Sequence, residues 1–111
     1  MTQHTFEGKL PDGRKYFVLA GWDRMLGQFF LDVEEVPQNE NTPQEPIMLY
    51  ESMYDSKAPT LSWEYFASKL RELQIVVPDG MEQALNEERS VNAGNLTTNW
   101  DTKEPVLKLV T

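Results

Sequence analysis

Cysteine is absent from this chain of 111 residues, and histidine occurs only once. Without cysteine, thiolate metal sites, iron–sulfur clusters, disulfides and thiol nucleophiles are excluded. The single histidine, His4, lies near the start of the chain, where we expect a solvent-exposed side chain rather than a general base. The glycines match no phosphate-binding loop, and no Gly-x-Ser-x-Gly turn is present. The sequence therefore predicts a protein that is not an enzyme and uses no cofactor.

Long apolar runs are also missing, since no stretch approaches the roughly 20 residues that cross a bilayer. The first residues lack a basic segment followed by an apolar one, so no signal peptide is predicted. We therefore expect one cytoplasmic domain over residues 1–111, without a membrane partner. A chain of this length can bury a core without disulfides or metal. The sequence leaves open whether it is a monomer or a homodimer.

Negative charge, by contrast, is concentrated in one place. The net charge is −8, and residues 25–56 contain seven acids and no lysine or arginine. Such a block repels nucleic acids and anionic membranes, because their phosphates carry the same sign. We therefore expect no direct binding of nucleic acid and suspect a basic protein partner. The alternative is that the acids only keep a small domain soluble.

Alternating apolar residues predict an antiparallel meander in the N-terminal half. Three runs, 5–10, 15–22 and 28–36, are separated by short turns that contain glycine. The second run is apolar on both faces, which is typical of a central strand covered on both sides. Residues 47–54 predict a fourth strand at or near an edge, and the proline-rich residues 37–46 predict an exposed loop.

The third run has two different faces. Asp32 and Glu34 lie on one of them, opposite a face made of apolar residues, because successive side chains of a strand alternate. The aromatic residues expected in the core are Phe17, Phe29, Trp63 and Phe66.

Helical periodicity begins after residue 61. Ser62 is the expected N-cap of a first helix, with a hydrophobic staple between Leu61 and Phe66, and Asp79 with Glu82 forms the capping-box pattern of a second helix that Gly94 ends. The predicted fold class is α+β, an antiparallel sheet of three or four strands with two helices packed on one face. Residues 95–111 are either a flexible tail or include a further strand at Val106–Val110.

The function expected from these features is non-catalytic protein binding, as an accessory or regulatory module. Acidic residues would speed the encounter with a basic partner, and exposed aromatic residues would supply affinity. The predicted interaction surface consists of Asp32, Glu34, Glu51, Tyr50 and Tyr54. The alternative for the two tyrosines is a ring packed on the sheet with its hydroxyl group in water.

Two other functions remain open at this point. The first is a nucleic-acid mimic that occupies the basic groove of an enzyme, which requires Asp32, Glu34, Glu45 and Glu51 to share one surface. The second is a small hydrolase that uses Asp32 and Glu34 as paired carboxylates. A divalent-cation site built from these two residues and Glu35 is a related possibility, although a solvated strand face is the more common arrangement.

One segment resembles other proteins. Residues 19–24, Leu-Ala-Gly-Trp-Asp-Arg, followed by Phe29-Phe30-Leu31, resemble small bacterial proteins in which a Gly-Trp-Asp turn joins two strands. The resemblance implies a bacterial or mobile-element origin and brings no activity or site residue with it.

Overall fold

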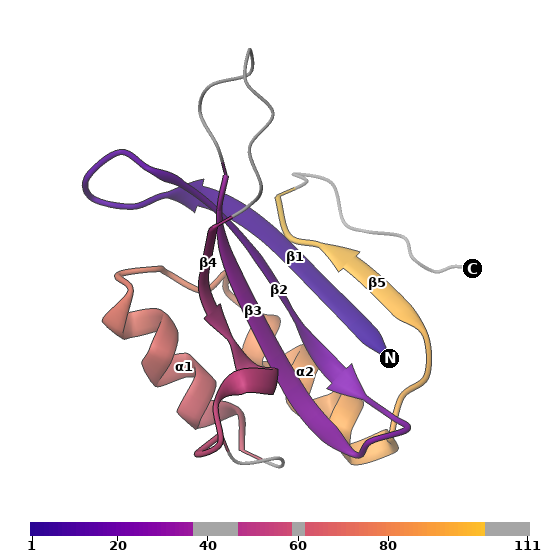
Figure 1. Ribbon diagram of the computed structural model, residues 1–111. Coiled ribbons are helices and arrows are strands. Elements are labelled where there is room, and N and C mark those ends of the chain that lie inside the picture. Colours follow the sequence, from indigo (N-terminus) through magenta and orange to yellow (C-terminus); the bar gives the residue numbers. More distant parts are fainter. Residues whose placement is uncertain (37–46, 59–61, 102–111) are drawn as a thin grey trace.

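The computed structural model describes residues 1–36, 47–58 and 62–101, which form a five-stranded sheet with two α-helices on one face (Figure 1). The strand order is β4-β3-β2-β1-β5; β1 to β4 pair antiparallel, and β5 pairs parallel with β1. The strands are β1 (Thr2–Lys9), β2 (Lys15–Asp23), β3 (Gln28–Val36), β4 (Ile47–Glu51) and β5 (Leu96–Asn99). A short 3-10 helix, η1 (Ser52–Tyr54), follows β4, and the helices are α1 (Trp63–Glu72) and α2 (Met81–Val91).

The predicted α+β class is therefore correct, and so are the antiparallel meander and the central place of β2. The predicted fourth strand is shorter than expected, because the chain turns into η1 after Glu51. It does lie at an edge of the sheet. The proline-rich residues 37–46 lie outside the described residues. Within the described part of the chain, no helix is long and apolar enough to cross a membrane.

The two hairpin turns explain the register of the meander. Gly13 has a positive φ of 93° in the first turn, a conformation that side chains disfavour. In the second turn the Asp23 carboxylate accepts hydrogen bonds from the backbone N–H groups of Met25 and Leu26. Gly27 then closes this turn at a φ of 64°. Both turns hold β2 in register with its two neighbours.

Each strand of the meander has an inner face, under the helices, and an outer face. Val18, Ala20, Leu31 and Val33 are fully buried on the inner face. They pack with residues of both helices, among them Trp63, Phe66, Leu70, Met81 and Leu85. The expected core position of Phe17 is wrong, because it alternates with Val18 and lies half-buried on the outer face. The described helices cover one face only, so β2 is not covered on both sides as its composition predicted.

The predicted boundaries of the two helices agree with the structure better than the predicted capping interactions do. Ser62 is the N-cap of α1, as predicted, but its side chain makes no capping hydrogen bond; the expected staple partner, Leu61, lies outside the described residues. Gly80 rather than Asp79 occupies the N-cap of α2, at a φ of 91°, so the predicted capping box does not form. The helix ends at Asn92 in the left-handed conformation, two residues before the predicted Gly94.

The largest departure from expectation is at the first and last strands. His4 is only 1% exposed, on the inner face of β1, which corrects the prediction of an exposed side chain. Its Nε2 lies 2.8 Å from both carboxylate oxygens of the buried Glu88 in α2, and its Nδ1 accepts a hydrogen bond of 2.9 Å from the indole N–H of Trp100. Because an indole N–H can only donate, the imidazole proton sits on Nε2 and points to Glu88.

This buried chain of hydrogen bonds fastens β5 beside β1. β5 is a fifth strand in a polar segment where none was predicted, whereas the predicted strand at Val106–Val110 lies outside the described residues. Trp100 follows β5 directly, stacks on the imidazole of His4 and donates its backbone N–H to the carbonyl of Thr5. Contacts between residues about 90 positions apart therefore close this edge of the sheet.

Candidate functional site

The outer face of the sheet carries large apolar side chains next to carboxylates. Paired residues of neighbouring strands form rows across it, because side chains opposite each other in a ladder share a face. One row contains Leu19, Asp32 and Glu51, from β2, β3 and β4. The next contains Phe17, Glu34 and Met48.

Glycine makes room for an aromatic ring in a third row. Gly21 pairs with Phe30, and a Cβ atom on Gly21 would meet the Cζ atom of the Phe30 ring at 2.8 Å and the carbonyl oxygen of Thr2. The ring of Phe30 therefore lies across Gly21 on the outer face. This accounts for a glycine in the central strand of the sheet.

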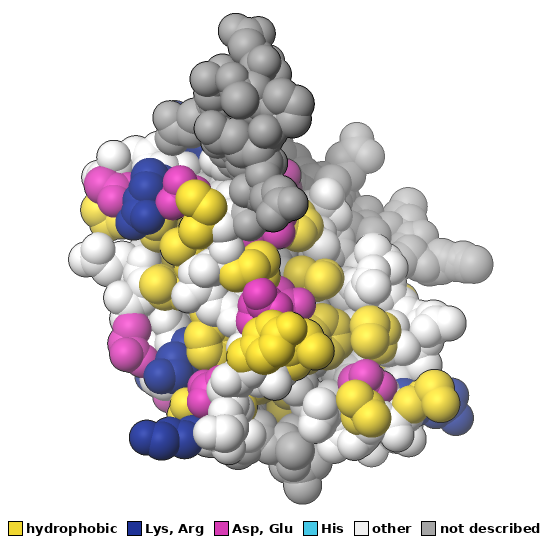
Figure 2. Space-filling view, viewed as in Figure 1, with side chains coloured by type: hydrophobic (Ala, Val, Ile, Leu, Met, Phe, Trp, Pro, Cys, Tyr) yellow, Lys and Arg dark blue, Asp and Glu magenta, His cyan; other side chains and the backbone are white. Residues whose placement is uncertain are grey.

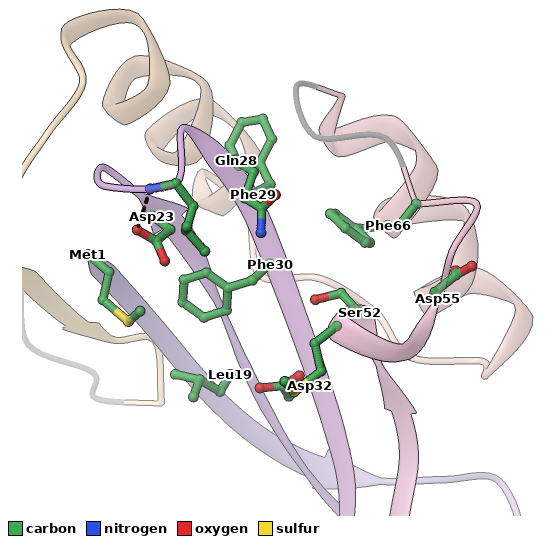
Figure 3. A pocket seen from close by; sticks show the side chains of 13 residues that line it. Met1, Leu19, Asp23, Gln28, Phe29, Phe30, Asp32, Ser52, Asp55 and Phe66 are labelled. Carbon is green, nitrogen blue, oxygen red and sulfur yellow. Dashed lines mark hydrogen bonds between the residues drawn. The ribbon is translucent and has the colours of Figure 1, made fainter.

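A cleft of about 480 Å³ opens along the N-terminal half of β3. Leu19 and Phe30 contribute its floor, and Met1, Leu26 and Met53 contribute apolar side chains around it. In Figure 3, Leu19 comes from β2, Phe30 and Asp32 come from β3, and Met1 directly precedes β1, whereas Phe66 comes from α1 on the other side of β3. Methionine side chains are flexible and polarisable, so a surface built from them adapts to different partners.

Figure 2 shows the molecule from the side on which the strands lie in front of α2. Hydrophobic side chains gather over the middle of this face. Carboxylates lie among them, while lysine and arginine side chains lie toward the edges of this face. Among the described residues, no lysine or arginine lines the cleft. An apolar and acidic surface of this kind suits a partner that is apolar and basic.

The outer-face rows contain three carboxylates, those of Asp32, Glu34 and Glu51, and the first of these is affected by burial and by its neighbours. Burial raises the pKa of Asp32, and the charges of Glu51 and Glu34 raise it further. A hydrogen bond from the backbone N–H of Ser52 partly offsets these effects. The ion pairs found among the described residues involve none of the three carboxylates. The charged form of Asp32 is therefore held next to like charges without a cation from the described chain.

Asp55 lies at the far side of the cleft and has a structural role. The hydroxyl groups of Tyr50 and Tyr65 donate to the same carboxylate oxygen of Asp55, at 2.7 and 2.8 Å. These bonds lower the pKa of Asp55, because they favour its charged form, and the pKa of the Tyr50 hydroxyl is raised by burial and by Asp55. The carboxylate joins the end of β4 to α1 and stays negative beside the cleft.

The structure brings together only part of the predicted interaction surface. Asp32, Glu34 and Glu51 lie close together on the outer face, as alternation predicted for the first two. Tyr50 does not join them: it pairs with the buried Val33, and its ring packs against Phe66 on the inner face. The register shifts between Val33 and Glu34, so that Tyr50 pairs with Val33 and Met48 with Glu34, which places Glu51 and Met48 on the same face.

Tyr54 is exposed in η1, one residue after the cleft-lining Met53. The cleft residues Met1, Leu26 and Met53 were missed because they lie outside the regular alternation of the strands. They lie before β1, in a turn and in η1, respectively. One signal could have indicated the apolar face. β2 is apolar on both faces, and two helices with narrow apolar stripes cover only one of them.

Two alternative sites were predicted from carboxylates: a divalent-cation site that includes Glu35 and a nucleic-acid mimic that includes Glu45. Glu35 pairs across the sheet with the buried Tyr16 and forms an ion pair of 2.9 Å with Arg14, so it lies on the opposite face from Asp32 and Glu34. Among the described residues, no group of three histidine, aspartate or glutamate side chains is arranged to hold a metal ion. Glu45, the fourth carboxylate of the nucleic-acid mimic, lies outside the described residues.

Comparison of the chain with models of protein families, with curated proteins and with solved structures gives no match.

Proposed function

We propose that this protein is a non-catalytic binding module whose outer sheet face docks a basic partner protein. The observation that carries the proposal is the apolar cleft over Leu19 and Phe30, bordered by Asp32 and its acidic neighbours without a lysine or arginine among the described lining residues. Burial of the apolar floor would supply affinity, and the carboxylates would steer a basic surface to it. A cytoplasmic location, expected from the sequence, is part of this proposal.

The apolar side chains around the cleft allow a first test with a matched control. Leu26 and Met53 are 67% and 77% exposed, so replacing both with serine removes apolar surface without opening the core. Val76 and Val91 are 84% and 72% exposed and do not line the cleft, so the same replacement there provides the control. Affinity capture from the native lysate should retain one protein with the wild type and with the control pair, and lose it with the Leu26→Ser and Met53→Ser pair. Equal capture by all three proteins would argue against this site.

The charged part of the surface allows a second test. A triple variant, Asp32→Asn, Glu34→Gln and Glu51→Gln, removes three negative charges from the outer face. Association with the captured protein should become slower and lose most of its dependence on salt concentration, because exposed charges act mainly on the encounter rate.

The control for this experiment removes the same three charges elsewhere. Asp79→Asn, Glu82→Gln and Glu87→Gln change exposed residues at and in α2, with the same residue types and the same change in net charge. If both triple variants slow association equally, then net charge rather than the outer face attracts the partner.

The nucleic-acid mimic is the second candidate, and one observation favours it. Asp32, Glu34 and Glu51 share one face, as three of its four required carboxylates. Apolar side chains flank them, since Leu19, Phe17 and Met48 lie in the same rows. A surface that only imitated phosphates would have no use for these side chains, so we favour a protein segment with apolar residues. Displacement of the captured protein by duplex DNA or RNA would support the mimic instead.

A further inference from the structure

We infer that the cleft recognises an arginine that lies next to a large apolar residue in a segment of the partner protein. This inference rests on the proposed function, because it names the chemistry of the docked segment. It is built from three features of the cleft: the floor of Leu19 and Phe30, the carboxylate of Asp32, and the apolar side chains of Leu26 and Met53.

The floor of the cleft selects the apolar residue. Leu19 and Phe30 are half-buried and lie in neighbouring rows of the outer face. Leu26 and Met53 are mostly exposed and belong to a turn and to η1, so they can close over an inserted side chain. A cleft of about 480 Å³ has room for a side chain as large as leucine, phenylalanine or tryptophan.

The position of Asp32 selects the cation. Asp32 follows Phe30 by two residues on the same strand face, so the two side chains start roughly 6–7 Å apart. A guanidinium group can stack on the Phe30 ring and at the same time donate two parallel hydrogen bonds to the Asp32 carboxylate. It is also weakly hydrated, which suits a half-buried acid whose charged form lacks a cation.

Lysine fits this position less well. Its ammonium group is compact and strongly hydrated, and it cannot make the planar two-bond contact. Glu34 and Glu51 next to Asp32 would repel an acidic residue at the same place. The cleft should therefore distinguish arginine from lysine, whereas a simple acidic surface would accept either.

The test uses the full chain and a phage-displayed library of random linear peptides. Selected peptides should share an arginine close to a large apolar residue. Synthetic versions with arginine replaced by lysine should bind the wild-type protein about tenfold more weakly, which corresponds to losing one charge-assisted hydrogen bond. With the Asp32→Asn variant, the two versions should differ by about twofold or less, because the neutral amide offers a single acceptor.

Asp79→Asn is the matched control, since it neutralises an exposed aspartate that does not line the cleft. This variant should keep the tenfold preference for arginine. Circular dichroism of each variant establishes that it is folded before binding is measured.

Three results would overturn the inference: no selected peptide, selected peptides without arginine, or an arginine preference that Asp32→Asn leaves unchanged. Failure of the proposed function looks different. Peptides that bind lysine and arginine equally but are lost with the Leu26→Ser and Met53→Ser pair would end the arginine inference and leave protein binding at this cleft intact. Peptides that bind all variants equally would count against both.

Discussion

Asp32 provides a stability test of the idea that the outer face is kept for binding. Its carboxylate is half-buried, and Glu51 lies directly opposite on β4. Asparagine has nearly the same shape and can still accept the hydrogen bond from the backbone N–H of Ser52, but it carries no charge. We expect Asp32→Asn to be more stable than the wild type at neutral pH, because the substitution removes a charge that burial and like neighbours disfavour.

The size of the gain follows from the neighbours of the carboxylate. A like-charge pair directly opposite in a sheet costs roughly 0.2–1 kcal/mol, and Glu34 on the same strand face adds a smaller repulsion. Partial burial of the charge adds to this cost. The total is about 1 kcal/mol, which in a domain of this size corresponds to an increase in Tm of about 4 °C.

The gain should depend on pH in one direction. Because the pKa of Asp32 is higher in the folded than in the unfolded chain, the unfolded chain ionises first as the pH rises. The free energy of unfolding of the wild type therefore falls as the pH rises from the ordinary pKa of 3.8 to the raised pKa of Asp32. Above the raised pKa, the loss of stability stays constant. Asp32→Asn should therefore be more stable at neutral pH and equal to the wild type below the ordinary pKa.

Urea unfolding followed by circular dichroism, at neutral pH and at about pH 3, measures the gain in the free energy of unfolding and its dependence on pH. The Glu51→Gln background provides a double-mutant cycle: the gain from Asp32→Asn should shrink there, because one of the repelling charges is gone. Asp79→Asn is the control for removing an exposed charge and should change stability little. Loss of stability in Asp32→Asn at neutral pH, or an equal gain at both pH values, would refute the reasoning.

Three further substitutions test other parts of the structure. Trp100→Phe should cost about 1–3 kcal/mol in urea unfolding, because it leaves the buried Nδ1 of His4 without a donor while keeping an aromatic ring. Gly21→Ala should cost about 1–3 kcal/mol, since the added methyl group meets the backbone of Thr2; wild-type stability in this variant would mean that the close approach is absent. Asp55→Asn should destabilise the fold at neutral pH, because the low pKa of Asp55 reflects stability that is present above the ordinary value of 3.8 and lost as the pH falls through the lowered one. Thermal unfolding of Asp55→Asn and wild type should therefore converge in acid.

Local pattern predicted those parts of the fold that local contacts determine. The alternation in residues 28–36 predicted both β3 and its two faces, because a strand with one buried face shows a period of two. The spacing of apolar residues after Ser62 predicted α1, because a helix with one buried face repeats its apolar residues every three or four positions. The predicted caps of α2 were wrong because backbone conformation at Gly80 and Asn92, rather than side-chain capping, determines the ends of this helix.

Contacts between distant parts of the chain could not be predicted in this way. β5 is short and polar, and it exists as a strand because β1 lies beside it in parallel. His4 is buried because Glu88 and Trp100, 84 and 96 residues away, satisfy both of its nitrogen atoms. In the candidate site, alternation placed Asp32 and Glu34 correctly. It also places Tyr50 on the face opposite its neighbour Glu51, whereas the register shift brings Met48 to the face of Glu51.

The environment of Asp32 on the outer face favours a binding role over the simpler explanation that the acidic residues only maintain solubility. Carboxylates that serve solubility alone act best where water surrounds them, and their positions relative to apolar side chains are then unimportant. Asp32 is instead half-buried between Leu19 and Glu51, where its charge is disfavoured. A stability cost of this kind is typical of residues kept for function, because selection acts on stability only down to a threshold. If Asp32→Asn stabilises the protein and also weakens the preference for arginine, then one substitution measures both the cost of this carboxylate and its purpose.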